Sequence, residues 1–255
     1  MLQLLDFLFA QLILYARIYI MNSVSKPAFT LAEVLITLAI IGVVAAMTIP
    51  ALTNKTNKQE LVVGLKKSYE VLSQVAYRIK ADNGGDLSNA LNNLSSDSDH
   101  DGLANVFISK LNVAKNCGID NALNSGCWTN QTITQLNGST AMNFVDSGGY
   151  FSTILTNDNI SYAFQAANKN CTQDNSGGNP SSPLYNSLCG QVYVDVNGPN
   201  KGPLQYGRDI FRFWITKNGV FPMGTGRSDV YTNCSTTGSG NACATRIMME
   251  GAMNY

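Results

Sequence analysis

The acidic side chain in the most unusual setting is Glu33. It is the one charged residue in the 21-residue stretch from Phe29 to Ile49, which is otherwise made of apolar residues, three threonines and a glycine. A carboxylate that faces lipid within a membrane helix costs about 2.5–3.5 kcal/mol, so Glu33 in such a helix requires a partner. The chemistry that this pattern indicates is pairing with a cation rather than catalysis.

A histidine-dependent active site would have to use His100, the only histidine of the chain. It lies between Asp99 and Asp101 in a predicted exposed turn, where we expect a solvated side chain that is poorly placed to act as a general base. No spacing selects a pair of carboxylates, and the glycine pairs at 148–149 and 177–178 lack the spacing of a phosphate-binding loop. We therefore expect no enzymatic activity.

The same turn carries a calcium candidate. Carboxylates occupy alternate positions before Gly102, as in the first half of a calcium-binding loop: Asp97, Asp99 and Asp101. The position at which such a loop has its bidentate glutamate holds Ile108. Two interpretations stay open, a solvated acidic turn, which we favour, and an unusual calcium loop. No other metal or cofactor is expected.

All six cysteines follow the apolar stretch: Cys117, Cys127, Cys171, Cys189, Cys234 and Cys243. An even number confined to the exported side of a membrane protein is typical of disulfides. No Cys-x-x-Cys pair is present, which argues against a structural zinc site. The sequence does not determine the pairing; our hypothesis is that neighbours pair, because three short loops are then closed.

Composition bounds the class of protein. The 255 residues carry 13% charged side chains and a formal net charge of zero. This balance argues against nucleic-acid binding, which normally needs a basic excess or stripe. Asn, Ser, Thr and Gly are abundant after residue 80, which is typical of an extracytoplasmic domain rich in loops.

The apolar stretch Phe29–Ile49, closed by Pro50, would span about 30 Å as a helix, the thickness of the hydrocarbon core of a bilayer. Beyond it, apolar residues recur at steps of three and four: Leu61, Leu65, Tyr69, Leu72, Val75, Ala76 and Ile79. Together they predict one helix from about 29 to 80, interrupted or bent near Pro50, with Asn83-Gly84-Gly85 as its stop.

The second half of the chain is predicted to form strands. Segments 160–167, 191–196 and 211–217 are rich in β-branched and aromatic residues, and Asn218-Gly219 predicts a hairpin to 220–221. Short helices are expected at 103–111 and at the C-terminus from Cys243. The fold class is α+β: a long N-terminal helix, half hydrophobic and half amphipathic, packed on a small antiparallel sheet of three or four strands.

The residues before the apolar stretch predict a cleaved leader. Lys26-Pro27-Ala28 places a basic residue and then a small one at its start, and Lys26 favours a cytoplasmic leader. Residues 1–20 are apolar, but Asp6 and Arg17 interrupt them. They are either a discarded part of the leader or the result of a misplaced start, with translation from Met21, which we favour.

These residues carry a family resemblance. Ala28-Phe29-Thr30-Leu31-Ala32-Glu33 resembles the type III signal of type IV pilins and of type II secretion pseudopilins. The resemblance implies cleavage by a prepilin peptidase between Ala28 and Phe29, methylation of the new Phe29 amine, and a pilin-like fold. Glu33 then stands fifth in the mature chain, and Gly42 and Pro50 fall on two further family positions. Ala28 departs from the pattern, because the family usually has Gly there.

The resemblance also implies a function. The chain would be a structural subunit of a type II secretion pseudopilus or a type IV pilus-like filament, assembled with itself and other pilin-like subunits by an inner-membrane platform and its ATPase. Glu33 would face the Phe29 ammonium of a neighbouring subunit. The protein would cross the bacterial inner membrane once, with a cytoplasmic N-terminus and a head in the periplasm or at the cell surface.

Two alternatives stay open, a minor-pilin adhesin or DNA-uptake tip subunit, and a signal-anchored extracytoplasmic enzyme.

Major pseudopilins carry a calcium-bearing loop in their C-terminal sheet, and Asp195, Asn197 and Asp209 flank a similar loop here, where we favour an ordinary capped turn. The expected segments are a leader at 1–28, an assembly helix at 29–53, its amphipathic continuation at 54–82 and a disulfide-containing head at 83–255.

Overall fold

A computed structural model describes residues 29–119, 125–141 and 149–255. The chain divides into two compact units, Met1–Thr53 and Asn54–Tyr255. The expected leader, including Ala28, lies outside the described residues. The second unit, Asn54–Tyr255, is called the head.

One helix, α2, runs from Leu31 to Asp82. It is a single element, as the periodicity predicts. Of the two expectations at Pro50, an interruption or a bend, the interruption is wrong, since the helical assignment continues through that residue. A proline removes one hydrogen bond of the helical ladder, and long helical stretches on both sides offset that loss. The helix ends as predicted: Gly84 and Gly85 both have positive φ angles, of 73° and 89°, and the Gly85 N–H donates to the Lys80 carbonyl at 2.7 Å.

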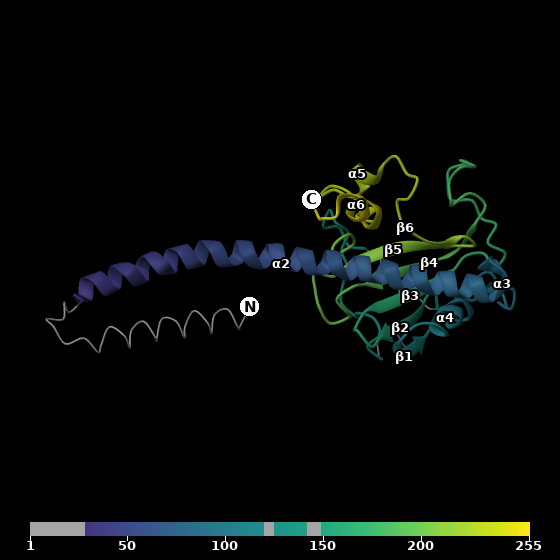
Figure 1. Cartoon of the computed structure of the whole chain (residues 1–255), viewed down its shortest axis with the longest axis horizontal. Helices are drawn as coiled ribbons and strands as arrows, with labels where there is room; N and C mark the ends of the chain where they lie inside the picture. Colours follow the sequence, from purple (N-terminus) through teal and green to yellow (C-terminus); the bar gives the residue numbers. More distant parts are fainter. Residues whose placement is uncertain (1–28, 120–124, 142–148) are drawn as a thin grey trace. The chain divides into compact units, whose positions relative to one another are not determined.

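The head contains one six-stranded antiparallel sheet in the order β1-β2-β3-β4-β5-β6, so neighbours in sequence are neighbours in space (Figure 1). Its strands are β1 (Val113–Gly118), β2 (Ser152–Thr156), β3 (Ser161–Ala166), β4 (Leu188–Asp195), β5 (Ile210–Thr216) and β6 (Gly219–Pro222). The α+β class is confirmed. The sequence predicts β3 to β6 but misses β1 and β2, which add two strands at one edge.

The amphipathic part of α2 packs against one face of this sheet. Leu65 and Leu72 are fully buried, and the Tyr69 ring stacks on Phe213 of β5 with centroids 6.0 Å apart. A Cβ atom on Gly64 would lie 3.1 Å from the side chain of Val196, which follows β4, so glycine allows the helix to approach this segment closely without displacing it. Burying each large side chain contributes about 1.5–3 kcal/mol, which makes this face the main source of the head's stability.

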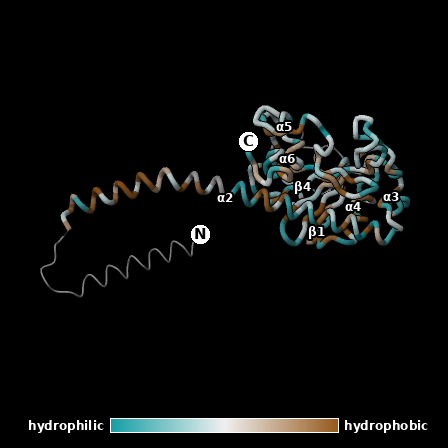
Figure 2. The backbone as a smooth tube through the Cα atoms, turned by 45° about the horizontal axis from the view of Figure 1, so that its top comes forward, coloured by the Kyte–Doolittle hydropathy of each residue, from teal (hydrophilic) through white to brown (hydrophobic). Residues whose placement is uncertain are grey.

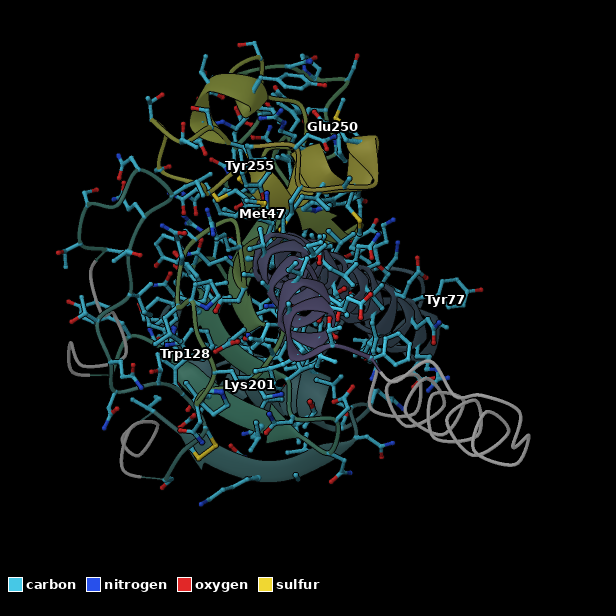
Figure 3. All side chains as sticks on the ribbon, turned by 90° about the vertical axis from the view of Figure 1, so that its left-hand side faces the viewer. Met47, Tyr77, Trp128, Lys201, Glu250 and Tyr255 are labelled. Carbon is cyan, nitrogen blue, oxygen red and sulfur yellow. A yellow bond between two sulfur atoms is a disulfide. The ribbon has the colours of Figure 1, made fainter. Side chains whose placement is uncertain are left out.

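Four short helices complete the head: α3 (Ser88–Leu91), α4 (His100–Ile108), α5 (Val230–Asn233) and α6 (Cys243–Glu250). α4 adds Phe107 to the same core, where its ring meets Phe164 of β3 at 5.3 Å. The opposite face of the sheet has a separate cluster around Trp128 and Tyr193. Figure 3 shows Trp128 on the other side of the sheet from Tyr77, which belongs to α2.

The six cysteines are paired as neighbours, in the disulfides Cys117–Cys127, Cys171–Cys189 and Cys234–Cys243. Their partners are 10, 18 and 9 residues apart. Each closes a short loop and is expected to contribute about 2–4 kcal/mol, mainly by restricting the unfolded chain. The first holds the edge strand β1, the second holds β4, and the third ties α6 to the segment that follows α5.

Candidate functional site

The start of α2 is a capping box formed by Thr30 and Glu33. The Glu33 Oε2 atom accepts hydrogen bonds from the Thr30 backbone N–H at 2.8 Å and from its hydroxyl at 2.9 Å. In return, the Thr30 Oγ1 atom accepts from the Glu33 N–H at 3.3 Å. The Thr-x-x-Glu pattern signals this motif, and the bonds add an intramolecular role for Glu33 to the expected intermolecular one. Glu33 therefore also fixes the first turn of its own helix.

The residues after this capping box form an apolar surface all round the helix. The segment Leu31–Ile49 is 19 residues long, has a mean hydropathy of 2.3 and buries none of its residues inside the described structure. The tube in Figure 2 is mostly brown, meaning hydrophobic, along this segment. A helix with apolar side chains on every side is stable only where lipid or other protein covers it. The segment thus fits a single-pass membrane anchor.

The other predicted assembly residues lie on the same helix. Phe29 lies two residues before its start at Leu31 and is 80% exposed. A Cβ atom added to Gly42 would meet nothing within 4 Å, so the backbone there is open to close approach by another helix. Pro50 continues the helix, as described above. Glu33 and Gly42 therefore lie in the N-terminal part of α2 and Phe29 lies just before it, whereas the cleavage residue Ala28 lies outside the described residues.

Comparison with known proteins identifies this segment. Residues 25–49 match the family described as the prokaryotic N-terminal methylation motif, which is characteristic of type IV pilins and pseudopilins. The match supports a type IV pilin-like or pseudopilin precursor, a class that is processed by prepilin peptidase and assembles with pilin subunits. Proteins of this class are usually structural rather than enzymatic. No curated protein and no solved structure matches the chain.

The expectation of a solvated histidine in an exposed turn is wrong. His100 begins α4, only 5% of it is exposed, and its Nδ1 atom accepts the backbone N–H of Ala166 in β3 at 3.0 Å. Burial lowers the pKa of His100 below its usual 6.5, against the opposing influence of the Asp99 and Asp101 carboxylates. The imidazole is therefore a neutral acceptor that joins α4 to the sheet, which a local sequence pattern could not reveal.

Two of the acidic residues near His100, Asp97 and Asp99, have separate structural partners. Asp99 precedes α4 and caps it: its Oδ1 atom accepts the Gly102 N–H at 2.8 Å, and its Oδ2 atom accepts the N–H and hydroxyl of Ser95 at 2.8 and 2.9 Å. These bonds, that of the Ser95 N–H first, lower the pKa of Asp99. Asp97 accepts the Lys169 N–H at 2.9 Å. Within the described residues, no three His, Cys, Asp or Glu side chains gather as a metal site.

The loop between β4 and β5 is better suited to a cation. Asp195 and Asp209 are 1% and 0% exposed. The Asp195 Oδ1 atom accepts the Gly198 N–H at 3.0 Å, whereas its Oδ2 atom is buried and has no hydrogen-bond partner among the described residues. The same holds, within the described part of the chain, for two more buried oxygens, Asn197 Oδ1 in the same loop and Ser161 Oγ opposite Asp195 on β3. Buried polar atoms are normally satisfied, so this group needs an explanation.

Both carboxyl groups titrate abnormally. Burial, and then the nearby Asp209, raise the pKa of Asp195 to about 8. Burial raises the pKa of Asp209 to about 6, although it accepts the N–H groups of Leu204 and Gln205 at 2.7 Å. Two buried carboxyl groups in one loop, with carbonyl and hydroxyl oxygens beside them, have the chemistry of a hard-cation site. The residues thus fit the calcium alternative for this loop as well as the ordinary capped turn that the sequence favours.

Proposed function

We propose that the protein is a structural subunit of a type II secretion pseudopilus or a type IV pilus-like filament. The observation that carries the proposal is the Thr30–Glu33 capping box at the start of an exposed apolar helix, inside the matched methylation motif. Cleavage between Ala28 and Phe29 would leave the new ammonium group beside a carboxylate. An inner-membrane platform and its ATPase would then draw the subunit, with its N-terminus on the cytoplasmic side, into the filament.

The capping box supports a second role for Glu33. Its Oε2 atom is occupied by Thr30, whereas its Oε1 atom accepts no hydrogen bond within the described residues. One oxygen can therefore hold the helix start while the other receives the Phe29 ammonium of a neighbouring subunit. Such a pair would offset two charges in a medium of low dielectric constant and would set the stagger between adjacent helices.

The experiment compares two substitutions of Glu33 in the full chain. Glu33→Gln keeps an oxygen for the capping box but removes the charge, and Glu33→Ala removes both. If charge pairing drives assembly, both variants insert into the membrane and both fail to form subunit–subunit cross-links. Glu70→Gln, an exposed acid later on the same helix, is the matched control and should cross-link normally.

Mass spectrometry of the mature N-terminus tests the processing step. The expected product begins with N-methylated Phe29. An uncut leader, or normal cross-linking of Glu33→Gln, contradicts the proposal and favours a signal-anchored protein whose head acts by itself.

We also propose that the β4–β5 loop of the head binds a calcium ion. The supporting observation is the group of partnerless buried oxygens at Asp195, Asn197 and Ser161, next to the Asp209 carboxyl group. A bound cation would keep both aspartates ionised in spite of their burial. Calcium binding by the head does not depend on filament assembly. Melting temperatures measured against pH, with calcium and with a chelator, test it.

A further inference from the structure

The face of the sheet opposite α2 carries a partly buried guanidinium group, that of Arg212 on β5. Its Cζ atom lies over the ring of Tyr193, its cross-strand neighbour on β4, at 5.0 Å from the centroid. It also lies over the ring of Trp214, two residues further along β5, at 4.8 Å. Both rings belong to buried residues, so the cation is held against an aromatic wall rather than in bulk water.

The charge of Arg212 has no counterion in the part of the chain that the structure describes. None of the four salt bridges found there includes it. Burial lowers the pKa of Arg212, against the influence of the Tyr193 and Tyr206 hydroxyl groups, and the charge of Arg227 lowers it further. Arg227 itself is paired with Asp229 at 2.6 Å, so that carboxylate is already occupied. A desolvated charge without an opposite charge is unfavourable, and an anion would relieve it.

The hydrogen bonds of Arg212 show which of its edges is free. A guanidinium group has five N–H donors. The Nε atom donates to the Gln191 Oε1 atom at 2.6 Å, and Nη2 donates to the same oxygen. Gln191 in turn donates to Gln165 on β3, which fixes the orientation of its amide. Among the described residues nothing accepts from Nη1, so the edge formed by Nη1 and the second N–H of Nη2 is available.

We propose that this edge of Arg212 binds the carboxylate of a small organic anion. Two parallel N–H donors match the two oxygens of a carboxylate, and such a bidentate pair is stronger than a single hydrogen bond. The rings of Tyr193 and Trp214 lie against the guanidinium group, with centroids 5.0 and 4.8 Å from its Cζ atom, so a ligand binds at the free Nη edge and in line with the guanidinium plane. A flat carboxylate fits this approach better than a tetrahedral phosphate or sulfate, whose remaining oxygens project out of the plane.

Gln191 holds the guanidinium in place and is therefore the positioning residue of the proposed site. Its amide oxygen supplies no charge, so it orients Arg212 without neutralising it. Replacing that amide with a carboxylate of the same shape would neutralise the arginine internally. Gln191→Glu is thus predicted to abolish binding of an external carboxylate while leaving the fold intact.

The test is a titration of the full-length protein in detergent micelles, observed through the ¹⁵N resonance of the Arg212 Nε–H group. Sodium acetate is the probe, acetamide is its uncharged counterpart, and sodium phosphate at matched ionic strength is the competing class of anion. Acetate is expected to shift the resonance to a plateau, with half-saturation in the millimolar range, whereas acetamide leaves it unchanged. Phosphate should produce only the weak, unsaturated drift of an ionic-strength effect.

Three variants complete the experiment, with tryptophan fluorescence and the positions of well-resolved backbone resonances as readouts for those that lack the arginine signal. Arg212→Lys keeps the charge but removes the fork, and Gln191→Glu fills the site from within; both should lose the saturable acetate response. Lys169→Ala, a cation elsewhere on the head, should keep it. A linear acetate response, an equal response to acetamide, saturation by phosphate alone, or a normal response in folded Gln191→Glu protein would each overturn the proposal.

Discussion

The two parts of helix α2 are built from similar leucines but meet different surroundings. Leu38 in the N-terminal unit is 60% exposed, whereas Leu65 in the head is fully buried against the sheet. The first part is apolar on every side and relies on lipid or other subunits for cover, while the second is apolar on one face and finds its cover inside its own head. The comparison separates residues that stabilise the subunit from residues available for assembly.

The largest expected effect tests this separation directly. Leu65→Ala leaves a cavity in the head core and should lower the free energy of unfolding of the head by about 2–5 kcal/mol. Leu38→Ala, the same change on the exposed part of the same helix, should leave head unfolding unchanged. Thermal unfolding of the full chain in detergent, followed by near-ultraviolet circular dichroism, measures both, and equal destabilisation would show that the two parts do not differ as described.

The difference between the two parts also decides what the sequence reveals. The membrane helix and its processing signal depend on residues that are neighbours in the sequence, so a linear pattern predicts them. The Thr30–Glu33 capping box also rests on a local pattern, Thr-x-x-Glu. The strands β3 to β6 are predicted because their β-branched and aromatic residues are typical of buried strands.

Features that depend on distant partners are not predictable in this way. β1 reads Val-Ala-Lys-Asn-Cys-Gly, with little apolar alternation, and exists as an edge strand because β2 and the Cys117–Cys127 disulfide hold it. His100 is buried because β3 offers it an N–H group 66 residues away. The same holds for Arg212 and Gln191, whose contact follows from the register of β4 against β5.

The second prediction concerns Asp195 and Asp209 of the head. Because their folded-state pKa values are raised above the usual 3.8, the calcium-free head binds protons more tightly than the unfolded chain does. The contribution of these two carboxyl groups to the stability of the calcium-free head is therefore full below about pH 4 and is lost as the pH rises through about 6 and about 8, their folded-state pKa values. In a chelator, the melting temperature of the unmodified protein relative to that of Asp195→Asn should fall by several degrees over this interval.

Added calcium should remove that decline, because the bound ion stabilises the ionised carboxylates of the folded state. Asp195→Asn should be insensitive to both calcium and chelator, and without calcium should be more stable than the unmodified protein at pH 8. Asp174→Asn, an exposed acid outside this loop, is the control. An equal melting temperature of the unmodified protein with calcium and with chelator at pH 8 would reject a calcium site.

The third prediction has the opposite sign and concerns His100. Since its folded-state pKa is lowered, its contribution to stability is complete above pH 6.5 and is lost as the pH falls from 6.5 through the folded-state value. Protonation removes the acceptor of the Ala166 N–H and places a charge in a buried site. Amide exchange at Ala166 should accelerate on acidification, and Asp195→Asn should leave this acid response unchanged, because the two groups titrate independently.

The smallest effect is expected at the Thr30–Glu33 capping box. Thr30→Val removes the hydroxyl that both accepts from and donates to Glu33, which should cost about 1 kcal/mol of local helix stability. Amide exchange should increase at residues 31–33 in micelles, while the melting temperature of the head stays the same, because the first turn belongs to the other compact unit. Thr37→Val, whose hydroxyl only returns to the Val34 carbonyl within the helix, is the control. If assembly depends on the Glu33 charge rather than on the rigidity of the first turn, Thr30→Val should form subunit cross-links normally and Glu33→Gln should not. Loss of cross-links in both variants would show that assembly requires the ordered helix start and not the charge pair.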